Sequence, residues 1–312
     1  MAEDRSTRVW DLLIIGAGPA GLTCAIYAGR ARLSTLVLDR LGPGGQVALN
    51  HFVENYPGFA DGIEGLKLAD EMGRQAERFG AEVEAGEVTA LAAAERPFSV
   101  QTEVGVRRGR AVVIAAGCAP RRLEVPGEQE LYQRGVSYCA TCDGPLFSGK
   151  HVIVVGGGNS AIWEALFLSR FASKVTVIHR RDKLRADRGV QERAFADPKI
   201  EFLWSHTVTA IIGENTVRGV RAKHVASGEE REVAADGVFV AVGTVPQTEF
   251  LPPEIARDQA GFVVVSPSLQ SSVEGVFACG DVRSGGYRQI AFAVGDGALA
   301  YRSARQYLEG RP

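Results

Sequence analysis

The sequence has little of what marks several common protein classes. Its 312 residues include five cysteines and five histidines, and only Cys139 and Cys142 are close together in sequence. A disulfide-rich scaffold is therefore excluded, and a zinc site is disfavoured because no second cysteine pair or closely spaced histidine pair supplies the other ligands. The remaining cysteines lie in apolar surroundings and are interpreted as small buried side chains: Cys24, Cys118 and Cys279. We expect no metal.

Long apolar runs and an excess of one charge are also missing. No segment approaches the ~20 apolar residues that a membrane-spanning helix needs. The formal net charge is -2, so neither a nucleic-acid partner nor an anionic membrane surface is indicated. These features favour a cytoplasmic protein that binds neither nucleic acid nor membrane.

Glycine, in contrast, is abundant, and its first cluster has a recognisable form. Gly16-Ala17-Gly18-Pro19-Ala20-Gly21 follows an apolar run at 9–15 and opens a predicted helix at 19–30. The first glycine permits a tight turn, the second lets backbone approach a pyrophosphate, and the third allows close helix–strand packing. Asp39 ends the next apolar run, 18 residues after Gly21, where a carboxylate can bind ribose hydroxyls. The pattern predicts a dinucleotide site.

The same order of elements begins again at Val152. Gly156-Gly157-Gly158-Asn159-Ser160-Ala161 follows an apolar run, and the next strand, 174–179, ends in basic residues: His179, Arg180, Arg181 and Arg185. Because guanidinium groups bind phosphate through paired hydrogen bonds, this cluster indicates a 2′-phosphate site and hence NADP(H) rather than NAD(H). For His179 itself two interpretations stay open, a nucleotide contact and a packed histidine at a strand end.

Two copies of one strand–turn–helix–strand plan predict two dinucleotide folds. We expect further helices at 65–79, 160–171 and 289–308, and further strands at 112–116, 237–242 and from 275. The last strand and helix complete the first fold, so the second domain is inserted into the first near 118–120 and 243–246. The predicted fold class is α/β with two Rossmann-like domains, made of residues 1–118 with 246–312, and of residues 119–245.

Between the two glycine-rich motifs lies Cys139-Ala140-Thr141-Cys142-Asp143. A pair of cysteines at this spacing closes a small disulfide ring, and its thiolate can have a lowered pKa. We therefore expect a redox-active pair. Asp143 is either a general acid beside the sulfurs or a turn-forming residue before Gly144-Pro145.

These motifs together resemble the low-molecular-weight, bacterial-type thioredoxin reductases along nearly the whole chain. The resemblance rests on the motifs above and on Gly-Gly-Gln at 44–46, Val-Glu-Asn-Tyr-Pro-Gly at 53–58, Gly-Asp-Val at 280–282 and Tyr-Arg-Gln at 287–289. It implies an NADPH-dependent flavoenzyme that passes electrons through FAD and the cysteine pair to thioredoxin. It also implies a homodimer.

The resemblance implies a role for each matching residue. Cys142 is the sulfur that faces the flavin, Cys139 is the outer sulfur that attacks the protein substrate, and Asp143 is the acid. The outer domain is the FAD domain, with expected contacts from Gly16, Gly18, Pro19, Ala20, Gly21, Asp39, Arg40, Gly45, Gln46, Asn55, Asp281, Arg288, Gln289 and Ile290. The inserted domain is the NADP domain, with expected contacts from Gly156, Gly158, Asn159, Ser160, Ala161, His179, Arg180, Arg181 and Arg185.

The sequence departs from that family at a few positions. Trp163 stands where a glutamate is usual, Ala116 replaces a common threonine and Thr244 replaces a common histidine. Trp163 favours a rival of the same fold with another electron donor, such as reduced ferredoxin, whereas the arginine cluster argues against it. Two more rival functions are an O₂-dependent dithiol oxidase and a redox-sensing protein that binds nucleotides without turnover.

Overall fold

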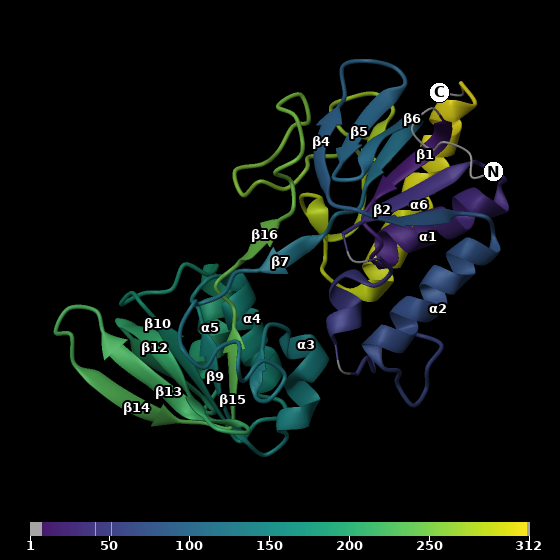
Figure 1. Ribbon diagram of the computed structural model, residues 1–312. Helices are drawn as coiled ribbons and strands as arrows, with labels where there is room; N and C mark the ends of the chain where they lie inside the picture. The colour runs from purple at the N-terminus through teal and green to yellow at the C-terminus, as the bar shows by residue number, and fades with distance from the viewer. Residues whose placement is uncertain (1–7, 41, 51, 311–312) are drawn as a thin grey trace. The chain divides into compact units, whose positions relative to one another are not determined.

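The computed structural model describes residues 8–40, 42–50 and 52–310, and the chain divides into two compact units (Figure 1). One unit combines the residues up to Ala119 with those from Val245 onward, and the other is Pro120–Thr244. These limits lie one residue from those expected, and the outermost ends of the expected ranges, 1–7 and 311–312, fall outside the described residues. Each unit is described below by itself.

The first unit is built on a sheet with strand order β3-β2-β1-β6-β5-β4, and β17 pairs with β6. Its strands are β1 (Val9–Ile15), β2 (Thr35–Asp39), β3 (Glu82–Ala85), β4 (Val88–Ala92), β5 (Phe98–Thr102), β6 (Gly105–Ile114) and β17 (Val276–Ala278). Its helical segments are α1 (Pro19–Arg30), η1 (Gly45–Leu49), α2 (Gly65–Arg78), η3 (Gly280–Val282) and α6 (Ile290–Leu308).

Alternate residues of the central strands enter two different cores because successive side chains of a strand point to opposite faces. Leu12 and Ile14 pack with the apolar sides of α1, α2 and α6. Leu13 and Ile15 pack instead with residues of β4, β5 and the segment at 251–263. The parallel strands of this sheet are thereby covered on both faces, as buried parallel strands require.

The second unit repeats this layering around a parallel sheet of order β11-β10-β9-β15-β8. Its elements are β8 (Val136–Ser137), α3 (Ala140–Asp143), η2 (Gly144–Phe147), β9 (His151–Val155), α4 (Asn159–Leu168), β10 (Lys174–His179), α5 (Arg188–Ala196), β11 (Ile200–Trp204) and β15 (Gly237–Val240). A three-stranded antiparallel sheet follows β11 in the chain: β12 (His206–Gly213), β13 (Val217–His224) and β14 (Glu230–Ala234). Val152 and Val154 face α4 and α5, whereas Ile153 and Val155 face the antiparallel sheet.

The two connecting segments, β7 (Cys118–Pro120) and β16 (Thr244–Pro246), pair with each other as a two-stranded sheet. Because β17 joins the sheet of the first unit, the tail of the chain completes the first fold, and the predicted fold class with an inserted second domain is confirmed. Among the described helices, none is both long and apolar enough to span a bilayer.

Candidate redox and dinucleotide sites

The expected FAD residues of the first unit gather where its parallel strands end. In register, Ile15 pairs with Leu38 and with Ile114, and Ile114 pairs with Ala278. The segments that follow these strands, which hold Gly16, Asp39 and Asp281, therefore leave the sheet at one edge. Ligands of open parallel sheets bind outside this carboxyl edge.

The first glycine-rich turn has the shape that a pyrophosphate needs. Gly16 has a φ of +110°, and a β-carbon there would lie 2.3 Å from the carbonyl oxygen of Ala115, so only glycine fits. A β-carbon on Gly18 would meet nothing nearer than the Cα of Gly45, at 4.0 Å. Within the described residues no side chain caps α1, so its first N–H groups are available to an anion. The turn fits a dinucleotide phosphate.

Asp39 closes this turn through its carboxylate. One oxygen, Oδ2, accepts the Ala17 N–H at 2.8 Å, and the other, Oδ1, accepts the Gly42 N–H at 3.2 Å. The acid predicted for a ribose thus also holds the backbone at Ala17 and at Gly42. Arg40 follows it as an exposed side chain.

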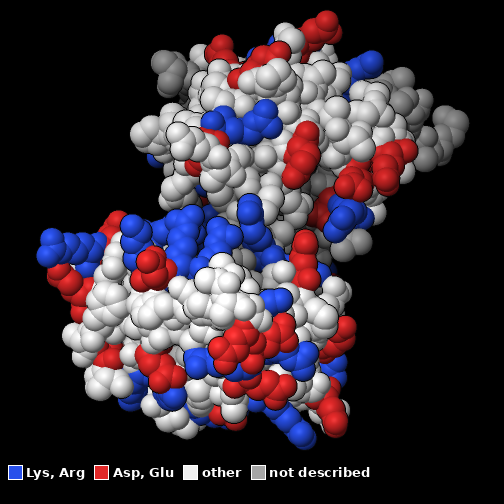
Figure 2. Space-filling view, turned by 90° about the vertical axis from the view of Figure 1, so that its left-hand side faces the viewer, with Lys and Arg blue, Asp and Glu red and all other residues white. Residues whose placement is uncertain are grey.

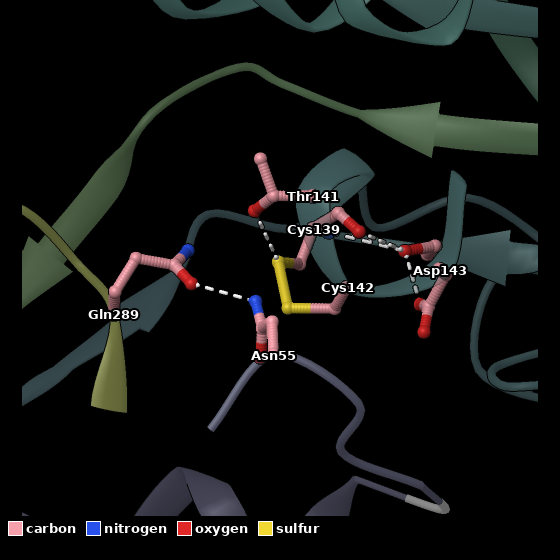
Figure 3. Close-up of a disulfide and its surroundings, with 7 residues drawn as sticks. Asn55, Cys139, Thr141, Cys142, Asp143 and Gln289 are labelled. Atoms are coloured by element: carbon pink, nitrogen blue, oxygen red, sulfur yellow. Dashed lines mark hydrogen bonds between the residues drawn. A yellow bond between two sulfur atoms is a disulfide. The ribbon is translucent and has the colours of Figure 1, made fainter. Parts of the chain in front are cut away.

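Residues far apart in sequence meet beside this turn. Gly45 begins η1 against Gly18, and Gln46 follows it with an exposed side chain. The Asn55 side chain donates from Nδ2 to Oε1 of Gln289 at 3.0 Å, and Figure 3 shows the two amides pointing toward each other. Gln289 is the residue before α6, whose first residue is Ile290. The structure therefore brings Gln289 next to Asn55, although 234 positions separate them.

Asp281 is held in place by an ion pair that the sequence did not reveal. Arg283 binds Asp296 of α6 through two hydrogen bonds, of 2.5 and 3.0 Å, and Asp296 also accepts the Gly280 N–H at 3.0 Å. These bonds fix η3, which carries Asp281. Burial raises the pKa of the Asp281 carboxyl, and the Arg288 guanidinium opposes that shift. The sulfur of Cys118 lies 4.0 Å from its Oδ2.

The Gly18→Ala variant is expected to fold normally and to lose FAD affinity by about 100-fold, because the added methyl has room in the protein but occupies the space of the pyrophosphate. Flavin fluorescence titration of the apoprotein measures the affinity. Gly295→Ala on the exposed part of α6, where a β-carbon meets nothing within 4 Å, is the matched control. If the two variants bind FAD with equal affinity, the pyrophosphate does not lie against Gly18.

The turn of the second unit is built in the same way. Gly156 has a φ of +152°, a β-carbon on it would lie 2.4 Å from the Ala241 carbonyl oxygen, and one on Gly158 would meet nothing within 4 Å. Gly158 precedes α4, which begins with Asn159 and Ser160, and no described side chain caps this helix. Asn159 and Asp187 exchange two hydrogen bonds, at 2.9 and 2.7 Å, which tie the helix to the loop after β10. Ala161 is fully buried behind the turn.

His179 is placed behind the turn as a packed side chain. Its ring is buried and lies so close to Gly157 that a β-carbon there would approach ring atoms to 2.4 Å. Burial, followed by the charge of Arg185, lowers its pKa, and no described group bonds its Nε2. The neutral ring therefore supports the turn, and its contact with a nucleotide stays a prediction.

The three arginines of the cluster are exposed on the loop that folds over this turn. The Arg185 N–H donates to the Gly157 carbonyl at 2.7 Å, which holds the loop beside the glycines. Within the described residues, the side chains of Arg180, Arg181 and Arg185 make no hydrogen bond or ion pair with protein groups, so they remain available to a ligand. Figure 2 shows a group of Lys and Arg side chains on the surface, left of centre at about mid-height of the view.

Trp163, the residue that departs from the family pattern, is 47% exposed on α4. The guanidinium of Arg193, from the neighbouring α5, lies 4.9 Å from the centre of its ring. This contact holds the indole on the outside of the helix pair, two residues after the end of the glycine-rich motif.

Cys139 and Cys142 form a disulfide. They follow β8, and Ser137 of β8 pairs with Phe239 of β15, whose next residue, Val240, pairs with Val155 of β9. The disulfide and the second glycine-rich turn therefore leave one sheet at the same edge, with a single strand between them. The Thr141 hydroxyl lies 3.4 Å from the Cys139 sulfur, where it can donate to a thiolate (Figure 3).

Asp143 is bound to a residue that sequence reasoning missed. Its Oδ2 accepts the Ser137 hydroxyl at 2.6 Å, and burial raises the pKa of its carboxyl while that bond opposes the shift. A raised pKa suits a proton donor near neutral pH. Across the described ranges, no three His, Cys, Asp or Glu side chains converge as metal ligands would.

Comparison with known proteins agrees with this arrangement. The profile of the pyridine nucleotide-disulphide oxidoreductase family matches residues 10–297. The thioredoxin reductase of Treponema pallidum is 45% identical over 300 residues, which cover 96% of this chain and 97% of that protein. That of Bacillus subtilis is 45% identical over 310 residues, covering 99% and 97%.

Solved structures give the same result. The thioredoxin reductase of Streptococcus pyogenes is 43% identical and superposes with a TM-score of 0.90, covering 98% of this chain and all of that one. That of Lactococcus lactis is 41% identical, with a TM-score of 0.68 and coverage of 96% and 99%. The predicted family is confirmed, because identity above 40% extends over nearly the full length of both chains. The chain belongs to the pyridine nucleotide-disulphide oxidoreductases and, among them, to the bacterial-type thioredoxin reductases.

Proposed function

We propose that the protein is an NADPH-dependent thioredoxin reductase with FAD as its cofactor. The observation that carries the proposal is the disulfide Cys139–Cys142 at the same sheet edge as the glycine-rich turn and the arginine cluster of one unit. The expected nucleotide site and the disulfide that accepts the electrons therefore lie at one edge of the same sheet.

The first unit would hold FAD on the turn at 16–21, with Asp39, Gln46, Asn55, Asp281 and Gln289 around it. The second would hold NADPH on the turn at 156–161, with the 2′-phosphate on Arg180, Arg181 and Arg185. FAD, when bound, would accept a hydride from NADPH and pass the two electrons on to the disulfide.

The chain's own residues would then perform the exchange with thioredoxin. Reduction breaks the Cys139–Cys142 bond and leaves two sulfhydryl groups. The Cys139 thiolate, with Thr141 as hydrogen-bond donor, attacks one sulfur of the thioredoxin disulfide and forms a mixed disulfide, and Asp143 gives a proton to the departing sulfur. Cys142 then attacks Cys139, which re-forms the internal disulfide and releases thioredoxin with two thiols.

A steady-state assay of the holoenzyme tests this function. With NADPH and oxidised thioredoxin we expect turnover. With NADH or reduced ferredoxin as the donor, or with O₂ as the acceptor, we expect a rate at least about 100-fold lower. For NADH this factor corresponds to the loss of two or more charged hydrogen bonds to the 2′-phosphate. Comparable rates with ferredoxin would instead support the rival that Trp163 favours. The proposal includes a cytoplasmic location, since reduction of protein disulfides belongs to a reducing compartment. It also includes a homodimer. Analytical ultracentrifugation tests the dimer.

A further inference from the structure

The Ser137 hydroxyl lies at the centre of the hydrogen bonds around the disulfide. It accepts the Cys139 N–H at 3.0 Å and donates to Asp143 Oδ2 at 2.6 Å, and the carbonyl oxygen of Cys139 lies 3.4 Å away as a second acceptor. The residue ends β8 and is buried. One side chain therefore bonds both to the backbone of the first cysteine and to the residue after the second.

We propose that Ser137 is a positioning residue that holds the Asp143 carboxyl in place and reverses its hydrogen bond when that carboxyl gains or loses its proton. The proposal rests on the proposed function, in which Asp143 gives up a proton during exchange. It adds a residue that acts through Asp143 and does not itself touch the substrate.

The reversal follows from the number of protons available. A serine hydroxyl has one proton and two lone pairs, and the Cys139 N–H occupies one of those lone pairs. When Asp143 is ionised, the hydroxyl proton points to the carboxylate. When Asp143 is protonated, its own O–H can donate to the second lone pair, and the serine proton turns to the Cys139 carbonyl. Each protonation state of Asp143 is therefore met by a different orientation of one hydroxyl.

Tyr132 lies near Asp143, and the helix packed against α3 carries a further titratable group, Glu164. Burial raises the pKa of the Tyr132 phenol, and the nearby Asp143 charge adds to that shift. Glu164 is the titratable residue of α4, the helix packed against α3, and Gly144 beside Asp143 abuts Phe167 and Leu168 of that helix. Burial raises the pKa of Glu164 to about 8, and its Oε2 has no partner within the described residues. The bond from Ser137 is the specific contact that favours the ionised form of Asp143.

Infrared spectra of the oxidised holoenzyme at a series of pH values test the proposal without NADPH or thioredoxin. The C=O band of protonated Asp143 is assigned by its loss in Asp143→Asn, and the Glu164→Gln background removes another carboxyl whose pKa is raised by burial. Ser137→Ala should move the titration midpoint of the Asp143 band up by about one pH unit, the size expected for one hydrogen bond to a charged group. The basic limb of the turnover pH profile should move to higher pH by the same amount, because the acid keeps its proton to higher pH. On the plateau below that limb kcat should fall about tenfold, because the carboxyl is no longer held in place.

Two variants separate positioning from a merely structural effect. Ser137→Thr keeps the hydroxyl and should restore the wild-type midpoint. Ser169→Ala removes a buried hydroxyl of the same unit that donates to the Leu166 carbonyl at 3.0 Å, and it should leave the midpoint unchanged. A midpoint that stays put in Ser137→Ala, or shifts equally in Ser169→Ala, overturns the proposal. Absence of thioredoxin turnover in the wild type would instead overturn the proposed function, since the infrared midpoint does not depend on it.

Discussion

Replacing Cys142 by serine is expected to lower thioredoxin turnover below about one-thousandth of the wild-type rate while the enzyme still oxidises NADPH at its flavin. The variant cannot re-form the internal disulfide, and removal of a covalent catalyst costs at least this much. Its remaining thiol, Cys139, should accumulate as a mixed disulfide with thioredoxin, which mass spectrometry detects. Cys139→Ser should be equally inactive but form no such adduct, and Cys142 should instead perturb the flavin absorbance after reduction.

The opposite assignment of the two sulfurs has a distinct outcome. If Cys139→Ser traps thioredoxin and Cys142→Ser does not, the inner and outer roles are reversed. Cys24→Ala is the control for loss of a thiol, because Cys24 is fully buried on α1 and outside the exchange chemistry. It should retain turnover.

Changing Arg180 and Arg181 together to alanine is expected to weaken NADPH binding by about 2–4 kcal/mol, or roughly 30- to 1,000-fold in Kd, because each lost charged hydrogen bond costs about 1.5–3 kcal/mol with some overlap. NADH binding should change little, because it has no 2′-phosphate. Both arginines are exposed and bind no other described side chain, so the change should leave the melting temperature unaltered. Equilibrium titration of the oxidised enzyme with NADP⁺ and NAD⁺ measures both affinities.

Arg188→Ala is the matched control for this cluster. Arg188 is an exposed arginine of the same unit, and its guanidinium is paired with Glu192 at 3.0 Å on α5. It should leave both affinities within a factor of about two, since exposed pairs of this kind contribute little. If the double variant loses the same affinity for NADP⁺ as for NAD⁺, Arg180 and Arg181 do not bind the 2′-phosphate.

The parts of the molecule that follow from local geometry could be predicted from the sequence. The turns at Gly16 and Gly156 are recognisable because the strand, the glycines and the helix occupy consecutive residues, and in both turns a β-carbon would collide with a neighbouring strand. The central strands are recognisable because they are continuous apolar runs. The insertion follows from counting strands, and the pairing of β17 with β6 bears it out.

The antiparallel strands were not predicted. Strands β4, β5 and β14 are only five residues long, and β12 and β13 mix buried with half-exposed and exposed positions, so no continuous apolar run marks any of them. Strand β6 was expected only from Val112, because its first half, from Gly105, is rich in arginine. There it is paired with β5. Arg108 and Arg110 are exposed, whereas Arg107 is buried and forms an ion pair with Glu84 at 2.9 Å.

Side-chain contacts between distant residues also lie beyond sequence reasoning. The bonds between Arg283 and Asp296, Asn159 and Asp187, and Ser137 and Asp143 join groups whose spacing carries no motif. For His179 the sequence left a nucleotide contact and a packed histidine both open, and the fold buries its ring against Gly157. The burial of a side chain depends on which distant residues pack around it, and a local sequence motif does not specify those residues.

Counting the electrons that the holoenzyme takes up tests the central claim most directly. The claim is that a flavin and the Cys139–Cys142 disulfide act in series, so an anaerobic reductive titration of the wild type should consume four electrons per chain. Because each serine variant has lost the disulfide, Cys139→Ser and Cys142→Ser should each consume two. An uptake of two electrons by the wild type, or of four by either variant, would contradict the account.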